Sequence, residues 1–243
     1  MYQEAINNYL NQHGHEKINL KAVLFDMDGV LFNSMPNHAS SWHKVMERMG
    51  FGLSEEEAYM HEGRTGADTI NIISRRERGC DATDEEIKAI YAAKSEEFNK
   101  CPEAPRMPGA WEVLNKIKDD GLTRMIVTGS GQVSLLDRLN KNFPGIFQKE
   151  LMVTAFDIKF GKPNPDPYLM ALEKGGLKPN EAIVIENAPL GVQAGVAAGI
   201  FTIAVNTGPL PDEVLWDAGA NLLFHSMPEF NENWENVKNA LIG

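Results

Sequence analysis

The sequence predicts an α/β fold, a doubly wound, Rossmann-like parallel sheet core with an inserted all-helical cap domain. Two observations support this prediction. Short apolar runs alternate with helical segments along most of the chain, which is the pattern of a parallel sheet with right-handed crossovers. The first apolar run is separated from the others by residues 36–103, a segment with helical patterns and no strand signal. The sheet is therefore expected to be interrupted by a helical insertion after its first strand.

The expected first strand, residues 23–25, ends in two aspartates and a glycine. It shows no alternation of polar and apolar residues, so it should be buried on both faces. Asp26 and Asp28 then follow its carboxyl end, where open α/β sheets bind their ligands. Two carboxylates this close repel each other, and a hard cation or a shared proton has to compensate. On its own, such an Asp-x-Asp-Gly segment is more typical of a turn at a strand end.

The later strands define the expected domain boundaries. These strands are expected near residues 124–127, 151–153, 182–185, 201–205 and 222–224. The core domain should comprise residues 21–35 and 104–243, and the cap domain residues 36–103, in which Ser54 is a typical helix N-cap. Residues 1–20 are expected to form an N-terminal extension, a short helix and a linker, with no function assigned to it.

Composition restricts the partners and the location of the protein. The net charge of −11 disfavours nonspecific nucleic-acid binding, and an anionic substrate would need a local cationic site. No apolar run approaches the roughly 20 residues of a membrane span, so no membrane association is expected. The two cysteines, Cys80 and Cys101, and a start without a signal-peptide pattern are typical of a cytoplasmic protein. The oligomeric state stays open, and a monomer is compatible with the sequence.

Four polar signals stand at strand ends or in the loops that follow. Each has an ordinary structural explanation: a hydroxyl after a strand is usually a helix cap, a lysine before proline is usually at the surface, and an asparagine after a strand is usually in a turn. Together, in one parallel sheet, they converge on one crevice. Carboxylates for Mg²⁺, a carboxylate nucleophile, and a hydroxyl and a lysine for phosphoryl oxygens suit phosphoryl transfer. The residues are Asp26 and Asp28, Thr128, Lys162, and Glu186 with Asn187.

The order of these motifs resembles the haloacid dehalogenase superfamily over residues 21 to about 226. The helical insertion after the first motif looks like that of the β-phosphoglucomutase-like branch. His38 and Trp42 fall where that branch carries a histidine and a tryptophan. The resemblance implies the same α/β core and helical cap, and it also implies roles for the individual residues.

By this resemblance, Asp26 would be the nucleophile that forms an aspartyl-phosphate. Asp28 would be the general acid/base, with its backbone carbonyl bound to Mg²⁺, and Thr128 and Lys162 would hold the transferring phosphoryl group. Electrostatics agree, because an attacking carboxylate and a phosphoryl group repel each other, and Mg²⁺ and Lys162 would relieve that repulsion. Asp28 has to be protonated to assist a leaving oxygen, so we expect its neighbours to raise its pKa.

The remaining candidate residues belong to the metal and the substrate. Glu186 and Asn187 would complete the Mg²⁺ site. The cap and the loop after Thr128 are expected to contact the substrate, through His38, Glu62, Gly63, Arg64, Gly129 and Ser130. A nucleotide-binding interpretation of the glycines at 129 and 131 is weak, because the third glycine position is Ser134.

Three departures from the mutase pattern bear on the substrate. Asn187 replaces the second metal-motif acid, so its oxygen can still ligate Mg²⁺ but brings no charge. Where the cap loop of the mutases reads as a lysine-glycine pair with an arginine three residues after the glycine, this chain has Glu62, Gly63 and Gly66. Gly131 stands where mutases carry a lysine. The cationic cradle for a sugar bisphosphate is therefore depleted, with Arg64 or Arg75 as the possible substitutes.

Glu62 decides between the candidate functions. A loop glutamate is ordinarily a solvated residue, but a position on the loop that closes over the nucleophile favours a function. If Glu62 reaches the metal, it replaces the charge lost at Asn187, a pairing that resembles the inorganic pyrophosphatases of this branch. The sequence therefore predicts a Mg²⁺-dependent phosphohydrolase, best guess inorganic pyrophosphatase, with small phosphate esters as weaker substrates.

Two alternatives stay open. The first is β-phosphoglucomutase, an isomerase of β-glucose 1-phosphate and glucose 6-phosphate. The second is a phospho-acceptor signalling module, which also uses Asp, Thr and Lys on a doubly wound sheet. The inserted cap and the acid at Asp28 argue against the signalling module, because such a module needs a long-lived phosphoaspartate.

Overall fold

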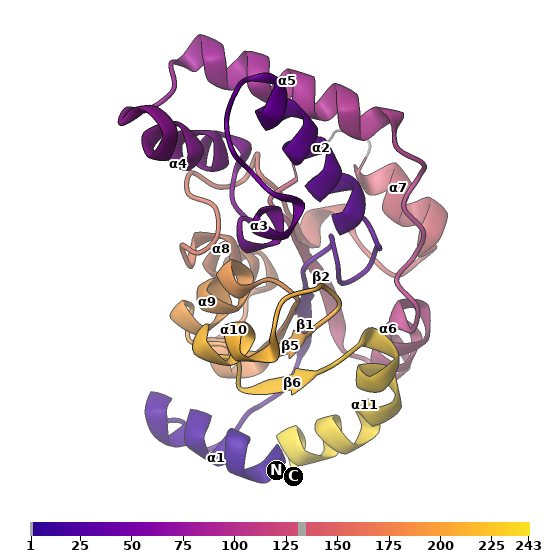
Figure 1. The fold of residues 1–243 in the computed structure, drawn as a ribbon. Helices are drawn as coiled ribbons and strands as arrows, with labels where there is room; N and C mark the ends of the chain where they lie inside the picture. Colours follow the sequence, from indigo (N-terminus) through magenta and orange to yellow (C-terminus); the bar gives the residue numbers. More distant parts are fainter. Residues whose placement is uncertain (1, 131–134) are drawn as a thin grey trace.

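The core of the computed structural model, which describes residues 2–130 and 135–243, is a six-stranded parallel sheet (Figure 1). The strand order is β3-β2-β1-β4-β5-β6. The strands are β1 (Ala22–Phe25), β2 (Thr123–Val127), β3 (Met152–Val153), β4 (Ala182–Glu186), β5 (Phe201–Val205) and β6 (Leu222–Phe224). The first strand lies in the middle, paired with β2 on one side and β4 on the other. The predicted doubly wound parallel sheet is confirmed.

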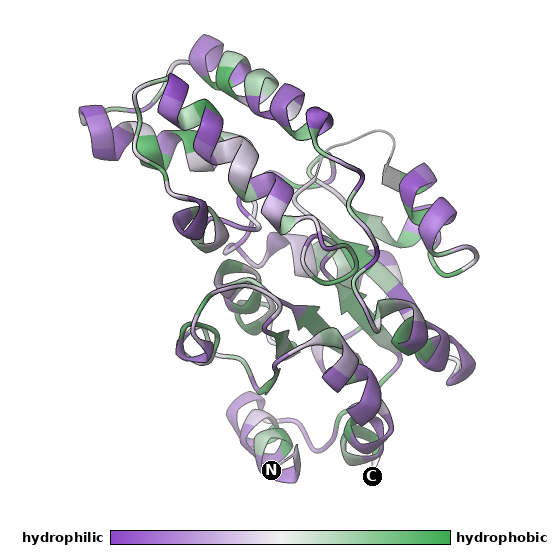
Figure 2. Cartoon of the chain, turned by 45° about the vertical axis from the view of Figure 1, so that its right-hand side comes forward, coloured by the Kyte–Doolittle hydropathy of each residue, from purple (hydrophilic) through white to green (hydrophobic). Residues whose placement is uncertain are grey.

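Helices cover both faces of this sheet, which explains the missing alternation in β1. Val23 and Phe25 pack in one apolar cluster, with α6 (Ala110–Asp119), α7 (Leu135–Asn142) and α11 (Met227–Ile242). Ala22 and Leu24 pack in the opposite cluster, with α8 (Asp166–Gly175) and α9 (Pro189–Ala197). The short helix α10 (Asp212–Asp217) covers β5 on the α9 side. Figure 2 shows the result, with hydrophobic strands inside and hydrophilic outer helix faces.

The N-terminal helix α1 (Tyr2–His13) docks on the core beside α11 (Figure 1). Ile6 and Tyr9 are buried there, and the Tyr9 hydroxyl donates a hydrogen bond to the Gly199 carbonyl at 2.8 Å. The Tyr9 ring meets Phe201 edge to face, with centroids 5.4 Å apart. These contacts tie the extension to the sheet by apolar packing and one buried hydrogen bond.

Between β1 and β2, the first four helices form a layer above the core in Figure 1, and the fifth, α6, belongs to the core. The four helices of the layer are α2 (Met35–Arg48), α3 (Glu55–Met60), α4 (Gly66–Arg78) and α5 (Asp84–Lys100). Residues 36–103, all of them described, contain no strand. The Ser54 hydroxyl accepts a hydrogen bond from the Glu57 amide and caps α3, as its sequence position predicts. The layer has an apolar cluster of its own, built on residues such as Met46, Ile70 and Ile73.

The remaining elements are two short 3-10 helices, η1 (Lys149–Leu151) and η2 (Pro179–Glu181). The helix α7 begins directly after residues 131–134, which lie outside the described part of the chain. Over the described part of the chain, no helix has both the length and the apolar character needed to cross a membrane.

Candidate active site

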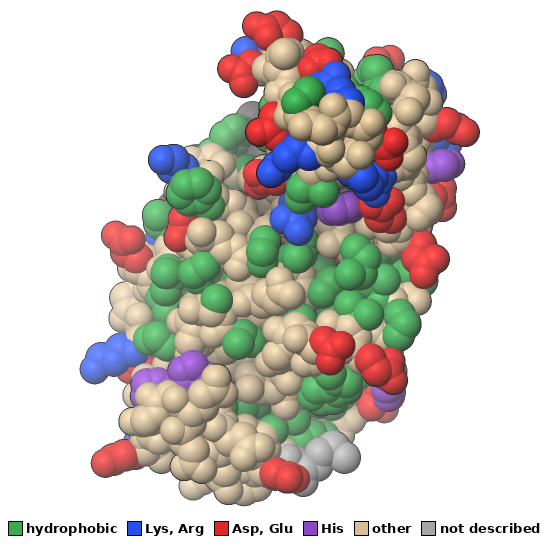
Figure 3. Space-filling view, turned by 60° about the vertical axis from the view of Figure 1, so that its left-hand side comes forward, with side chains coloured by type: hydrophobic (Ala, Val, Ile, Leu, Met, Phe, Trp, Pro, Cys, Tyr) green, Lys and Arg blue, Asp and Glu red, His purple; other side chains and the backbone are tan. Residues whose placement is uncertain are grey.

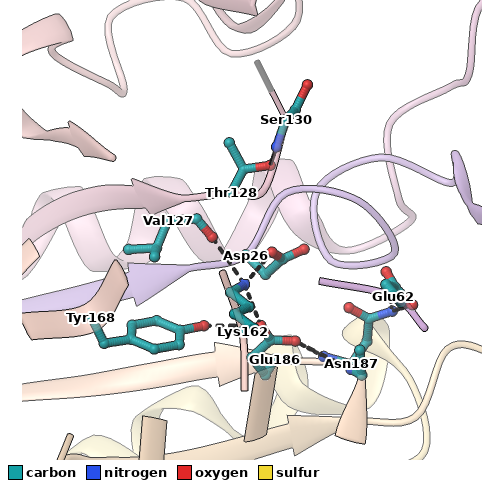
Figure 4. Close-up of polar contacts among 10 residues, drawn as sticks. Asp26, Glu62, Val127, Thr128, Ser130, Lys162, Tyr168, Glu186 and Asn187 are labelled. Atoms are coloured by element: carbon teal, nitrogen blue, oxygen red, sulfur yellow. Dashed lines mark hydrogen bonds and ion pairs between the residues drawn. The ribbon is translucent and has the colours of Figure 1, made fainter. Parts of the chain in front are cut away.

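Lys162 and Asp26 form the buried centre of the site, at the carboxyl end of β1. Their side chains are 1% and 7% exposed. Lys162 Nζ donates to Asp26 Oδ1 and to Glu186 Oε1, at 2.5 Å in each case, and to the Val127 carbonyl at 3.1 Å (Figure 4). All three N–H bonds of the ammonium group therefore have acceptors. A phosphoryl oxygen that binds Lys162 has to take the place of one of them.

Burial and charge act in opposite directions on this centre. Burial raises the pKa of Asp26 to about 7, the Lys162 charge lowers it, and the Glu186 and Asp28 carboxylates add to the rise. Burial alone would lower the pKa of Lys162, but the carboxylates of Asp26 and Glu186 hold it well above its usual range. The centre thus contains one charged lysine between two buried carboxyl groups. A bound cation or a phosphoryl group would change this balance of charge.

Asp28 lies among donors from the helical layer. The Ser34 hydroxyl donates to Asp28 Oδ1 at 2.5 Å, and His38 Nε2 lies 3.5 Å from the same oxygen. Burial raises the pKa of Asp28, but the facing His38 and the hydrogen bond from Ser34 outweigh it, and the pKa falls well below its usual range. The prediction that its neighbours raise this pKa is wrong, because they donate hydrogen bonds to the ionised form.

A buried lysine that the sequence analysis did not single out completes this cluster. Lys94, on α5, lies 2.7 Å from His38 Nδ1 and is 6% exposed. Burial lowers the pKa of Lys94 to about 8, and burial together with the Lys94 charge lowers the pKa of His38. With the ammonium on Nδ1, a neutral His38 carries its proton on Nε2, which faces Asp28. Lys94 is separated from Asp28 by most of the insertion, and only the fold brings them together.

Glu186 is fully engaged by protein groups. Its Oε1 accepts from Lys162 and from the Tyr168 hydroxyl at 2.9 Å, and its Oε2 accepts from the backbone N–H groups of Asn187 and Ala188. The first turn of α9 lies against the carboxylate, because a Cβ on Gly191 would come within 1.8 Å of Oε1. The side chain that was predicted as a metal ligand therefore contacts Lys162 here, and a metal role for it stays a prediction.

Glu62 and Asn187 join the helical layer to the core. Asn187 Nδ2 donates to both carboxylate oxygens of Glu62, at 3.0 Å each (Figure 4). Burial raises the pKa of Glu62 well above its usual range, and the nearby Asp26 adds to the rise. Asn187 Oδ1 is buried and has no hydrogen-bond partner among the described residues. An amide oxygen left in this way beside carboxylates is suited to a cation.

The oxygen atoms at this point fit a Mg²⁺ ion. In the described part of the chain, no three His, Cys, Asp or Glu side chains are spaced to hold a metal by themselves. A magnesium site here has to draw on neutral oxygens, the Asn187 amide and the Asp28 carbonyl, together with Asp26. Glu62, held on the same amide, is the nearest further carboxylate from the helical layer. Such a mixed oxygen set is what Mg²⁺ accepts in proteins.

Thr128 and the two residues after it form the third side of the site, at the end of β2. Thr128 is 2% exposed, and its hydroxyl accepts a hydrogen bond from the Ser130 amide at 3.1 Å. Gly129 lies against the cap loop, because a Cβ there would meet the Gly63 carbonyl at 3.3 Å. Gly131, which stands where the mutases carry a lysine, lies outside the described residues.

A cavity of about 100 Å³ lies between the core and the helical layer. The core side presents Asp26, Asp28, Thr128, Gly129 and Ser130, and the predicted cap residues His38, Glu62, Gly63 and Arg64 all line the opposite side. Lys162, Glu186 and Asn187 are not among the lining residues. Arg75, the other predicted substitute for the mutase arginine, instead pairs with Asp81 at 2.8 Å.

Tyr91 lines this cavity from the helical layer, and the sequence analysis did not single it out. A Cβ on Gly66 would lie 2.2 Å from Cδ2 of the Tyr91 ring, so the ring occupies the space that any side chain at residue 66 would need. Trp42 lines the cavity beside it, with ring centroids 6.5 Å apart. The position at which mutases carry an arginine is therefore filled by an aromatic ring.

Comparison with known proteins relates the chain to hydrolases. The family model described as haloacid dehalogenase-like hydrolase matches residues 23–205. Hexitol phosphatase A of Escherichia coli K12 is 34% identical over 188 residues, which are 76% of this chain and 83% of that protein. A phosphorylated carbohydrates phosphatase of Thermotoga maritima is 29% identical over 203 residues, 83% of this chain and 92% of that protein.

Solved structures show the same architecture. One from Bacteroides vulgatus, which carries a provisional beta-phosphoglucomutase name, is 78% identical with a TM-score of 0.97, over 100% of this chain and 98% of that chain. Beta-phosphoglucomutase from Clostridium difficile is 22% identical with a TM-score of 0.74, over 92% of this chain and 100% of that chain, and shares the fold.

Proposed function

Because the chain belongs to the haloacid dehalogenase-like hydrolase family, we propose that it is a Mg²⁺-dependent phosphohydrolase that works through an aspartyl-phosphate on Asp26. The observation that carries the proposal is the buried Asp26 at the carboxyl end of β1, paired with Lys162 and facing the cavity. A carboxylate held against a lysine beneath a cavity is suited to attack an anionic phosphoryl group.

The reaction proceeds in two displacements. An Asp26 oxygen attacks phosphorus, and the bond from phosphorus to the leaving oxygen breaks. Where that oxygen needs a proton, Asp28, which rests ionised, first takes one up from solvent and then passes it on. Water then attacks the aspartyl-phosphate, gives its proton to Asp28, and releases inorganic phosphate together with the Asp26 carboxylate. Thr128 and Lys162 hold phosphoryl oxygens. Bound Mg²⁺ supplies positive charge that offsets the repulsion between carboxylate and phosphate.

We propose inorganic pyrophosphate as the preferred substrate, on the observation that Glu62 meets Asn187 through both carboxylate oxygens. This contact brings a carboxylate from the helical layer to the metal side of the site, where it can join the ligands of a pyrophosphate-bound Mg²⁺ and would repel the distal phosphate of a sugar bisphosphate. The cavity of about 100 Å³ is small beside the roughly 300–1,000 Å³ of drug-sized ligand sites, and the Tyr91 ring fills the space beside Gly66. A compact diphosphate suits this space.

The second candidate is hydrolysis of sugar or polyol phosphates. The names of the relatives from Escherichia coli and Thermotoga maritima favour it. Trp42 and Tyr91 also give the cavity aromatic faces, against which the C–H groups of a polyol can pack. A mutase activity is less well supported, because it needs cations at both ends of a bisphosphate and Gly66 supplies none.

A phosphate-release panel tests these candidates. It contains pyrophosphate, hexitol phosphates, hexose 6-phosphates and β-glucose 1-phosphate, with Mg²⁺ present and with Asp26→Asn as the inactive control. We expect the highest kcat/KM for pyrophosphate and no release by the control variant. A higher kcat/KM for a hexitol phosphate would favour the second candidate, and formation of glucose 6-phosphate from β-glucose 1-phosphate would favour the mutase. Undiminished turnover by Asp26→Asn would refute the aspartyl-phosphate itself.

A further inference from the structure

Tyr168 lies beneath the phosphoryl site, and the proposed reaction gives it no role. It stands in the first turn of α8, six residues after Lys162, and is 0% exposed. Its hydroxyl donates to Glu186 Oε1 at 2.9 Å, and Lys162 Nζ lies over its ring, 5.2 Å from the centroid (Figure 4). We propose that Tyr168 is a positioning residue for Lys162, acting through Glu186 and through its own ring.

Two donors fix the orientation of the Glu186 carboxylate on its Lys162 side. The oxygen Oε2 is held by the backbone N–H groups of Asn187 and Ala188, at 3.0 and 3.2 Å. The oxygen Oε1 accepts from Lys162 and from Tyr168. Without the hydroxyl, only the flexible lysine chain would hold Oε1. The Glu186 carboxylate could then turn with the ammonium group of Lys162. It would no longer fix the position of that ammonium group.

The ring of Tyr168 adds a second constraint on the same ammonium group. A cation over an aromatic face is attracted to it, most strongly where water is excluded, and both side chains are buried here. The ring also packs in the apolar cluster on the α8 face of the sheet, so its own position is fixed. Tyr168 thus links the rigid core to the only lysine at the buried centre.

This arrangement matters when Asp26 forms its bond to phosphorus, so the inference rests on the proposed function. At that moment Asp26 Oδ1 no longer accepts from Lys162, and the released N–H turns to a phosphoryl oxygen. The other two N–H bonds stay on Glu186 Oε1 and on the Val127 carbonyl. A fixed Glu186 therefore aims the third N–H at the transferring group. This orientation of Lys162 acts in the transition state, so its loss should lower kcat.

The test compares Tyr168→Phe with Tyr9→Phe. Each variant loses the hydrogen-bonding hydroxyl of a buried tyrosine, and Tyr9 lies far from the site, with its hydroxyl on Gly199. We expect a decrease in Tm for each variant. Tyr168→Phe alone should lower kcat, by roughly tenfold, with KM unchanged, since hydrogen bonds to charged groups are worth more than neutral ones. Tyr168→Leu, which also removes the ring, should lower kcat further.

The outcomes separate this inference from the proposed function. If the unaltered protein releases phosphate and Tyr168→Phe keeps its kcat, the positioning role is refuted and the proposed function stands. The same holds if Tyr9→Phe and Tyr168→Phe lose kcat equally, or if only KM rises. If the unaltered protein releases no phosphate from any substrate of the panel, the proposed function fails and the inference falls with it.

Discussion

Asp28 shows how a single residue depends on contacts that lie far along the chain. Ser34, which precedes α2, and His38, within α2, hold its carboxylate. Lys94 from α5 contacts Nδ1 of His38 and so places the proton of a neutral His38 on Nε2. Donors to the ionised form lower the pKa of Asp28, so that the group rests as a carboxylate and holds no proton for a leaving oxygen near neutral pH. A phosphate leaving group needs little protonation, whereas a sugar alkoxide needs a full proton. The surroundings of Asp28 therefore agree better with pyrophosphate than with an ester.

Replacing Asp28 by Asn tests its role in proton transfer. The variant keeps the shape but can neither give nor take the proton, so we expect kcat to fall by roughly 10²- to 10⁴-fold for alkyl phosphates. The loss should be smaller for pyrophosphate and for a nitrophenyl phosphate, which have better leaving groups. The measurement is kcat for each substrate in both proteins. Equal losses for good and poor leaving groups would assign Asp28 another role.

Replacing Glu62 by Ala tests the choice of substrate. The change removes the carboxylate that Asn187 holds, so pyrophosphate turnover should fall strongly, while turnover of organic phosphates is kept or rises. The measurement is kcat/KM for both substrate classes. Glu56→Ala is the matched control, because Glu56 lies exposed on α3 and should change neither value. A uniform loss in Glu62→Ala would mean that the residue supports the site without selecting the substrate.

Among the elements, those with a regular pattern were predictable and those defined by contacts between elements were not. β1 could be predicted as a strand buried on both faces because Val23 and Leu24 are both apolar, although they face opposite layers. The positions of Asp26 and Thr128 followed from the strand ends. The sequence could not reveal that Glu186 contacts Lys162 and Tyr168, because side-chain orientation after a strand depends on packing by α8 and α9.

Glycines form the contact between the cap loop and the two loops that carry Thr128 and Lys162. A Cβ on Gly161 would meet Thr65 Cγ2 at 2.9 Å and the Thr65 amide nitrogen at 3.2 Å. Gly161→Ala should therefore hold the cap loop away from Lys162 and raise KM for pyrophosphate by roughly tenfold, about 1.4 kcal/mol. Gly52→Ala is the control, because its Cβ would make only an ordinary contact with Glu77 at 3.5 Å. An unchanged KM in Gly161→Ala would show that the loop adapts.

On the scale of the whole molecule, the site lies between two layers with separate apolar cores. In the view of Figure 3, the Lys and Arg side chains on the upper part of the molecule, where the helical layer lies, are interspersed with Asp and Glu side chains. The chain as a whole has a net charge of −11, so an anionic substrate is attracted only locally. Lys162 and Lys94 are buried on opposite sides of the cavity and supply that local positive charge.

A cation that bridges the two layers should stabilise the whole molecule as well as support turnover. Mg²⁺ that binds the folded protein alone raises its stability by about 2.7 kcal/mol at a hundredfold excess over Kd, which corresponds to a Tm several degrees higher. We expect this rise in the unaltered protein and a much smaller one in Asp26→Asn, which loses a charged ligand. Dialysis against a chelator should abolish turnover, and added Mg²⁺ should restore it, whereas Ca²⁺ should inhibit because its coordination is larger and looser. Full turnover in excess chelator would show that the reaction does not need the metal. An equal Tm rise in both proteins would show that the metal binds away from Asp26.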